Sequence, residues 1–248
     1  MRHLLVIGAQ RSGTTYLLSA LEAHPQIVTA RPGRPEPKVF MSDDLAGRGA
    51  QWYRDTYFSH RQEEPVLVEK STSYIEDASA PSRVRSVLGA ATIVVMLRDP
   101  VDRAVSNWRF STDNGLESRP LALALAENLE ASRPWDPRTT SVSPYAYVER
   151  GRFTDYLGPW LAQFPDTTHL VLMDDLVGTD SALEGVYEAA GVDPGFLPGT
   201  YGRPVNQSEE PAPALPAELT ARLRDYYLDS DAALRDLLGR DLPWRAAS

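Results

Sequence analysis

The chain of 248 residues is 42% hydrophobic and 24% charged, a composition that allows a sizeable core and argues against global disorder. Its 25 Lys and Arg against 34 Asp and Glu give a net charge of −9, which argues against broad nucleic-acid binding because that needs a basic face. The lack of Cys excludes disulfides and Cys-based zinc sites, and the four His show no paired ligand spacing, so we predict no metal. We expect one domain over residues 1–248.

The first predicted element is a buried strand over residues 3–7, followed by a turn between Gly8 and Gly13 and then an apolar-periodic helix. This geometry forms a phosphate cradle, because the N–H groups of the turn and the positive end of the helix face an anion. The glycine spacing matches a P-loop, but Thr14 replaces the Lys that reaches the terminal phosphate of a nucleoside triphosphate. Arg11 supplies a cation instead, which favours a nucleotide without that phosphate. The alternative is an ordinary strand, turn and helix without a ligand.

Residues 8–15, Gly-Ala-Gln-Arg-Ser-Gly-Thr-Thr, resemble the 5′-phosphosulfate loop of sulfotransferases that use 3′-phosphoadenosine-5′-phosphosulfate (PAPS). The Arg-Ser-Gly-Thr-Thr sequence of this loop is closer to the loops of tyrosylprotein and bacterial sulfotransferases than to those of the cytosolic ones. The resemblance implies an α/β fold: a three-layer, P-loop-like domain with a central parallel sheet and helices on both faces. It also implies that Arg11 acts on the sulfuryl group, and that the donor is bound by Gln10, Arg11, Ser12, Gly13, Thr14 and Thr15.

A proline-rich loop, residues 31–40, follows the first helix and a predicted turn at residues 23–27. Its three prolines exclude a regular helix or central strand, and it carries three cations and one carboxylate, Glu36. The loop resembles the Lys-Glu-x-x-Phe-Phe segment of glycan sulfotransferases, which implies that Glu36 is the general base for the acceptor. Because Pro35 stands where a Lys is common, a cationic role there falls to Arg34 or Lys38. The alternative is a solvated loop in which Glu36 only pairs with one of those cations.

Residues 65–74 predict a short strand that ends in polar residues. In an open α/β sheet, ligands gather at the carboxyl ends of the strands, so we expect Lys70 near the phosphosulfate. The stretch resembles the Glu-Lys-Ser/Thr-Pro-x-Tyr segment of the same family, with Thr72 in place of the usual Pro, and this implies a catalytic role for Lys70. The alternative is a Lys that faces water at a strand end.

Residues 91–97 form the clearest predicted buried strand, and Asp99 is expected to cap the helix that follows. Arg98 and Ser106, eight residues apart, resemble the pair that binds the 3′-phosphate of the donor in this family. The alternative for Arg98 is an ion pair with Asp99 or Asp102.

The remaining pattern alternates helices with one more strand. We predict an aromatic helix at residues 51–58 that serves the core, a helix at 121–129, an amphipathic helix reaching Phe164, a strand at 169–173, a helix at 181–190, and closing helices after residue 218. Residues 133–144 are predicted to form a long loop, a candidate lid that could set acceptor specificity. Tyr147 and Arg150 are candidates for the pocket. Gly202 and Arg203 loosely match a family loop that folds over the adenosine and 3′-phosphate.

These patterns predict a sulfotransferase that transfers a sulfuryl group from PAPS to a hydroxyl or amine and leaves adenosine 3′,5′-bisphosphate. The acceptor class is left open among a sugar or glycan, a phenol and a secondary metabolite, and so is the oligomeric state. No 18-residue apolar run or signal peptide is present, so we expect a cytoplasmic protein without membrane contact. The alternatives are a P-loop nucleotide kinase, which needs a Lys after Gly13, and a non-catalytic nucleotide-binding module, in which Glu36 is dispensable. Should Glu36 not be the base, His60 and Asp102 are the next candidates.

Overall fold

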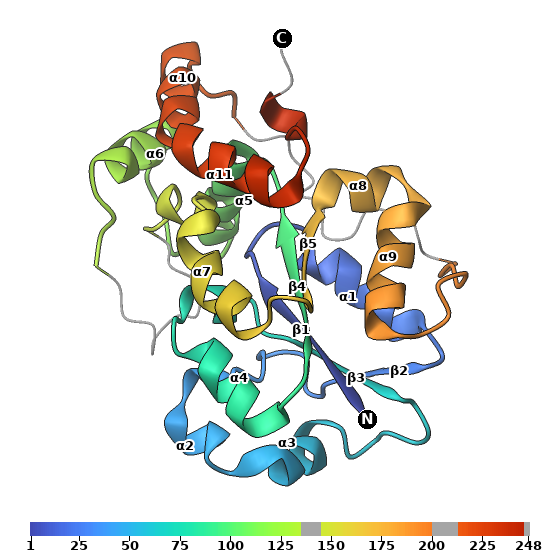
Figure 1. Cartoon of the computed structure of the whole chain (residues 1–248). Coiled ribbons are helices and arrows are strands. Elements are labelled where there is room, and N and C mark those ends of the chain that lie inside the picture. Colours follow the sequence, from blue (N-terminus) through green and yellow to red (C-terminus); the bar gives the residue numbers. More distant parts are fainter. Residues whose placement is uncertain (135–144, 200–212, 246–248) are drawn as a thin grey trace. The chain divides into compact units, whose positions relative to one another are not determined.

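The computed structural model describes residues 1–134, 145–199 and 213–245 of the chain (Figure 1). The packing of Cα atoms divides the chain into two compact units, which are described separately. Unit 1 comprises residues 1–97 and 156–205, and unit 2 comprises residues 98–155 and 206–248.

Unit 1 contains a five-stranded sheet whose strands all run parallel, in the order β2-β3-β1-β4-β5. The strands are β1 (Arg2–Gly8), β2 (Ile27–Thr29), β3 (Val66–Lys70), β4 (Thr92–Leu97) and β5 (Thr168–Leu172). Four of them confirm strands expected from short apolar runs. The predicted turn after the first helix is confirmed at residues 24–26, but the sequence did not predict β2, which follows the turn and pairs with β3. Three residues are too few to show a strand pattern in a sequence.

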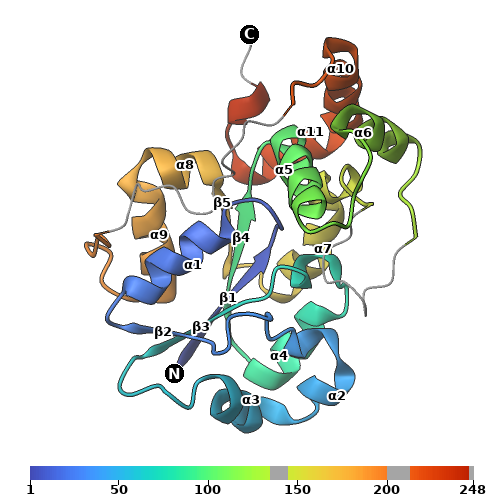
Figure 2. The same ribbon diagram turned by 180° about the vertical axis from the view of Figure 1, so that it is seen from behind.

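Helices cover both faces of this sheet, as predicted. Views turned by 180° show α1 and α9 on one face, and α4 with the body of α7 on the other (Figures 1 and 2). The helices of unit 1 are α1 (Thr14–Ala23), α2 (Asp43–Ala46), α3 (Gly49–Tyr57), α4 (Ala80–Leu88), α8 (Met173–Gly178) and α9 (Asp180–Ala190), while α7 (Thr154–Gln163) starts in the last residues of unit 2. Two short 3₁₀ turns are η1 (Val39–Met41) and η2 (Tyr74–Glu76).

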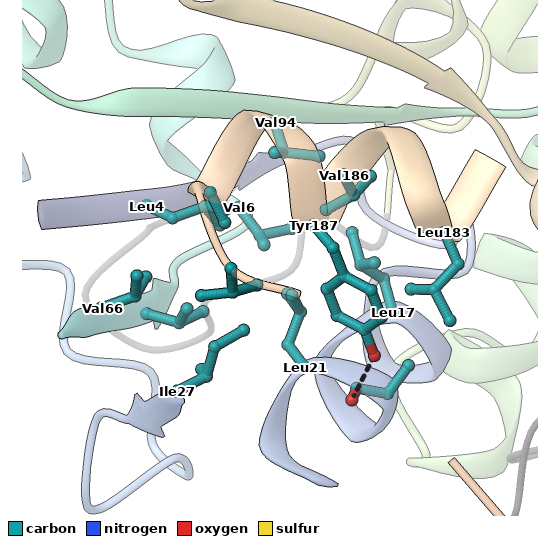
Figure 3. Close-up of a cluster of buried hydrophobic side chains, with 14 of the residues drawn as sticks. Leu4, Val6, Leu17, Leu21, Ile27, Val66, Val94, Leu183, Val186 and Tyr187 are labelled. Carbon is teal, nitrogen blue, oxygen red and sulfur yellow. Dashed lines mark hydrogen bonds between the residues drawn. The ribbon is translucent and has the colours of Figure 1, made fainter. Parts of the chain in front are cut away.

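The core beneath α1 and α9 explains why these segments fold together. Alternate strand residues such as Leu4 and Val6 point to this face, where they pack against Leu17 and Leu21 of α1 (Figure 3). Each fully buried aliphatic side chain contributes roughly 1.5–3 kcal/mol. Tyr187 of α9 is fully buried here, and its hydroxyl donates to the carbonyl of Ala20 at 3.0 Å (Figure 3). This core fixes the end of β1 relative to the start of α1.

Unit 2 is helical within the residues that are described. It consists of α5 (Pro100–Asp113), α6 (Leu121–Glu130), α10 (Ala217–Tyr226) and α11 (Leu228–Leu238), with η3 (Glu149–Gly151) and η4 (Pro243–Arg245). Asp99 caps α5 as predicted, since its Oδ1 accepts from the N–H of Val101 at 2.9 Å. The same carboxylate binds both terminal nitrogens of Arg224 at 2.6 and 2.7 Å, which ties α10 to the start of α5. No helix in the described part of the chain is long and apolar enough to cross a membrane.

Candidate active site

The turn between β1 and α1 is shaped by two glycines and by tight packing. Gly13 lies before α1 with φ 83°, a conformation that favours glycine, and a Cβ there would come within 3.1 Å of the side chain of Met173. A Cβ on Gly8 would lie 2.6 Å from the side chain of Ile75. Between them, the N–H of Ala9 donates to the carbonyl of Met96 at 2.8 Å, and Arg11 adopts a left-handed φ of 67°. The turn is therefore a specific structure that the glycines permit.

This turn has the features of an anion cradle. The N-cap residue of α1 is Gly13, which has no side chain to cap the helix, and the first turn carries no acidic residue. Ser12 is completely buried, and its Oγ has no hydrogen-bond partner among the described residues. A buried hydroxyl without a partner is costly, and a phosphate oxygen would satisfy it. Ser12 and the start of α1 therefore have the chemistry of an anion-binding turn, while the assignment of residues 10–15 to the 5′-phosphosulfate stays a prediction.

Glu36 and Lys70, which the sequence assigned to separate motifs, lie in contact. Lys70 Nζ is 2.7 Å from Glu36 Oε1, and the two side chains are only 11% and 16% exposed. Thr72 completes the contact, because its N–H donates to Glu36 Oε2 at 2.9 Å and its hydroxyl lies within 3.2 Å of both carboxylate oxygens. The partner of Glu36 is therefore neither Arg34 nor Lys38. Arg34 is exposed and makes no ion pair with any residue that the structure describes.

The segment after β3 also contacts the strand and turn that form the cradle. The N–H of Ser71 donates to the carbonyl of Val6 at 3.1 Å, and Gln10 Nε2 donates to Ser73 Oγ at 3.3 Å. Parallel strands end at the same edge of a sheet, so β1 and β3 deliver the cradle and Lys70 to one place. Unit 1 thus brings together a carboxylate, an ammonium group and a phosphate-type turn.

Sequence reasoning assigned no role to the carboxylate next to Lys70, although the family segment that it resembles begins with a Glu. Glu69 is 1% exposed and accepts three hydroxyl hydrogen bonds: from Tyr53 at 2.6 Å, from Ser71 at 2.5 Å and from Tyr74 at 2.7 Å. Burial raises the pKa of Glu69 above its usual value, although the three hydroxyl donors work in the opposite direction. The polar residues that follow β3 were a signal, since Ser71 and Tyr74 stand two and five positions after Glu69.

The predicted 3′-phosphate pair belongs to unit 2. Arg98 directly follows β4 in the chain, and its Nη2 lies 3.7 Å from Asp102 Oδ2, so the ion pair that we considered as the alternative does form. Ser106 is the next residue along the same face of α5, one turn beyond Asp102, and is half-buried. Arg98 therefore reaches along the face of α5 that carries Ser106. The assignment to a 3′-phosphate stays a prediction.

The remaining predicted residues are either buried or lie outside the residues that the structure describes. Tyr147 is completely buried in the core of unit 2, where its hydroxyl donates to Glu117 at 3.0 Å, and Arg150 is 7% exposed. Tyr147 is thus a core residue rather than a pocket side chain. Gly202 and Arg203 lie outside the described residues, as does most of the candidate lid, residues 135–144. Within the described ranges, no three His, Cys, Asp or Glu side chains form a metal-binding group.

Known proteins match this chain in sequence and in fold. A family model described as "Sulfotransferase domain" matches residues 1–176. Heparan sulfate glucosamine 3-O-sulfotransferase 3A1 of Mus musculus is 27% identical over 262 residues, which cover 97% of this chain and 63% of that protein. Heparan sulfate glucosamine 3-O-sulfotransferase 5 of Homo sapiens is 30% identical over 176 residues, or 70% of this chain and 48% of that protein. The chain therefore spans less than two thirds of either relative.

A solved structure shares the fold. The crystal structure of a sulfotransferase from Alicyclobacillus acidocaldarius superposes with a TM-score of 0.76 at 21% identity, covering 98% of this chain and 97% of that one. At this identity the likeness concerns the fold: a central parallel sheet surrounded by helices.

Proposed function

Because this chain belongs to the sulfotransferase family, we propose that it transfers a sulfuryl group from PAPS to a hydroxyl or amine of a small-molecule or glycan acceptor. The observation that carries the proposal is the contact of Glu36 with Lys70 next to the turn between β1 and α1. Two relatives are named for heparan sulfate and its glucosamine, which supports a glycan among the candidate acceptors.

The residues of the turn fit the donor by their chemistry. The N–H groups at the start of α1 and the buried Ser12 hydroxyl would bind its 5′-phosphosulfate, while Arg11 would add positive charge. Arg98 and Ser106 would bind its 3′-phosphate. When bound, PAPS supplies the sulfuryl group: a bond from sulfur to the acceptor forms, the bond from sulfur to the phosphate oxygen breaks, and adenosine 3′,5′-bisphosphate leaves.

Glu36 would take the proton that the acceptor loses. A carboxylate accepts up to about four hydrogen bonds, so Glu36 can still receive a proton while Lys70 and Thr72 bind it. Lys70 has two further N–H donors, which can stabilise negative charge on the departing oxygen. The contact between these two residues would thus place the base and the electrostatic stabiliser next to each other, beside the transferred group.

The test of the activity uses labelled PAPS with a panel of glycans, phenols and amines and with a metabolite extract, followed by mass spectrometry of the products. We expect label on an acceptor and release of the bisphosphate. Binding of the bisphosphate without transfer to any acceptor would favour the non-catalytic module. Transfer from ATP but not from PAPS would favour the kinase.

The role of Glu36 is tested by Glu36→Gln, which keeps an acceptor for Lys70 but lacks the charge. Turnover should fall roughly 10²- to 10⁴-fold, the usual contribution of a positioned base, with the Kd of the bisphosphate unchanged. Glu63→Gln, a change at an exposed position of the same unit, is the control. Near-normal turnover of Glu36→Gln would remove Glu36 from the mechanism.

A further inference from the structure

Glu69 is a buried carboxylate that pairs with no cation in the described part of the chain. Among the described residues, only neutral hydroxyl groups of Tyr53, Ser71 and Tyr74 bind it. A buried carboxylate that lacks a positive partner lowers the stability of the fold, and an apolar side chain of similar size would destabilise it less. The position therefore calls for an explanation other than packing.

The two oxygens of this carboxylate have different connections. Ser71 and Tyr74 both donate to Oε1, and each of these hydroxyls also accepts an N–H from the proline-rich loop. Lys38 N–H donates to Ser71 Oγ at 3.0 Å, and Phe40 N–H donates to the Tyr74 hydroxyl at 3.2 Å. Tyr53 of α3 donates to Oε2, and among the described residues its hydroxyl makes no hydrogen bond to the loop.

The direction of these hydrogen bonds depends on the carboxylate. A hydroxyl carries one hydrogen and two lone pairs, whereas an ionised carboxylate can only accept. In its ionised form Glu69 therefore draws the hydrogens of Ser71 and Tyr74 toward itself, which leaves their lone pairs for the two loop amides. Lys38 needs this support, because its φ of 52° lies in the left-handed region that side chains other than glycine avoid.

We propose that Glu69 is a positioning residue: through Ser71 and Tyr74 it anchors the backbone at Lys38 and Phe40, and so holds Glu36 against Lys70. Glu36 lies only two residues before the first anchored amide, and Pro37 between them restricts the backbone. The inference rests on the proposed role of Glu36 as base.

The test compares two Tyr→Phe changes, each of which removes a hydroxyl that donates to Glu69. The Tyr74 hydroxyl also accepts the N–H of Phe40 in the loop, so Tyr74→Phe removes a hydrogen bond to the loop. The Tyr53 hydroxyl makes no hydrogen bond to the loop among the described residues, so Tyr53→Phe removes only a bond to Glu69. Tyr74→Phe should lower kcat about 10- to 100-fold, because a small displacement of a catalytic group has effects of this size. Tyr53→Phe should lower the thermal midpoint similarly but keep kcat within about twofold, as expected for a group that acts only on stability. Neither change should alter the Kd of adenosine 3′,5′-bisphosphate.

A double-mutant cycle separates positioning from general damage. In the Glu36→Gln background, Tyr74→Phe should have no further effect on turnover, since the group that it positions has already lost its function. Two outcomes would overturn the inference while leaving Glu36 as the base. One is an equal loss in kcat for Tyr74→Phe and Tyr53→Phe. The other is an effect of Tyr74→Phe on kcat that is as large in the Glu36→Gln background as in the wild type. Normal turnover of Glu36→Gln alone would overturn both. If Tyr74→Phe fails to fold, Ser71→Ala interrupts the other connection and is subject to the same criteria.

Discussion

Lys70 in unit 1 and Arg98 in unit 2 are both predicted to face an anion, but their carboxylate partners differ. The partner of Lys70 is 2.7 Å away and 16% exposed, whereas the partner of Arg98 is 3.7 Å away and 61% exposed. An exposed, long ion pair is worth about 0–1 kcal/mol, so Arg98 can exchange Asp102 for a phosphate at little cost. In the enclosed pair, Glu36 also accepts hydrogen bonds from Thr72, so we expect this pair to be harder to separate. From this difference we predict that Lys70 serves turnover and that Arg98 serves binding of the donor.

Among changes to the cations, the largest effect should come from Lys70. Lys70→Ala should reduce kcat by about 10²- to 10³-fold, because the lost ammonium group stabilises charge that develops only during transfer. The Kd of adenosine 3′,5′-bisphosphate, measured by calorimetry, should change little. An unchanged kcat with a raised KM for PAPS would instead make Lys70 a simple binding residue.

Arg11→Ala should show the same pattern with a smaller loss, about 10²-fold in kcat. Arg11 lies in the turn itself and is half-buried, so it can approach the same developing charge. Steady-state kinetics with PAPS varied at a saturating acceptor concentration separates kcat from KM, and Arg11→Lys, which keeps the charge, is the matched control. Full activity of Arg11→Ala would leave charge stabilisation to Lys70 and the backbone amides.

The third prediction concerns Arg98, whose loss should act on binding. Removing one charge-assisted hydrogen bond costs about 1.5–3 kcal/mol, so Arg98→Ala should raise the Kd of the 3′,5′-bisphosphate roughly 10- to 150-fold. At saturating PAPS its kcat should stay near the wild-type value. Arg109→Ala, on the same helix, is the control.

The 3′-phosphate itself can be tested with ADP, which lacks it. Calorimetry should show that ADP binds the wild type more weakly than the bisphosphate does, and that Arg98→Ala leaves ADP binding unchanged. Equal affinities of the wild type for the two nucleotides would show that the 3′-phosphate assignment is wrong.

The smallest effect should come from Asp102→Asn. Because Asp102 competes with a phosphate for Arg98, its neutralisation should tighten binding of the bisphosphate by less than about fivefold. The gain should shrink at high ionic strength, since both side chains are accessible to salt. A loss of affinity would mean that Asp102 orients Arg98 rather than competing for it.

Much of the fold followed from local sequence patterns. The apolar runs that became β1, β3, β4 and β5 are visible because a strand buried on both faces needs consecutive apolar residues. The three-residue β2 and the short helices α2 and α8 were missed, because such segments are too short for a period and are stabilised by tertiary contacts.

The sequence by itself determined the cradle between β1 and α1, because glycine spacing and helix initiation are properties of neighbouring residues. It also supplied Glu36 and Lys70 as separate candidates. Only the tertiary structure decided that they pair with each other, since residues 34 positions apart meet only when the sheet brings the end of β3 beneath the proline-rich loop. The same holds for Glu69: the sequence shows one more charged residue in a strand, and only the tertiary structure shows that it is buried and accepts from three hydroxyl donors.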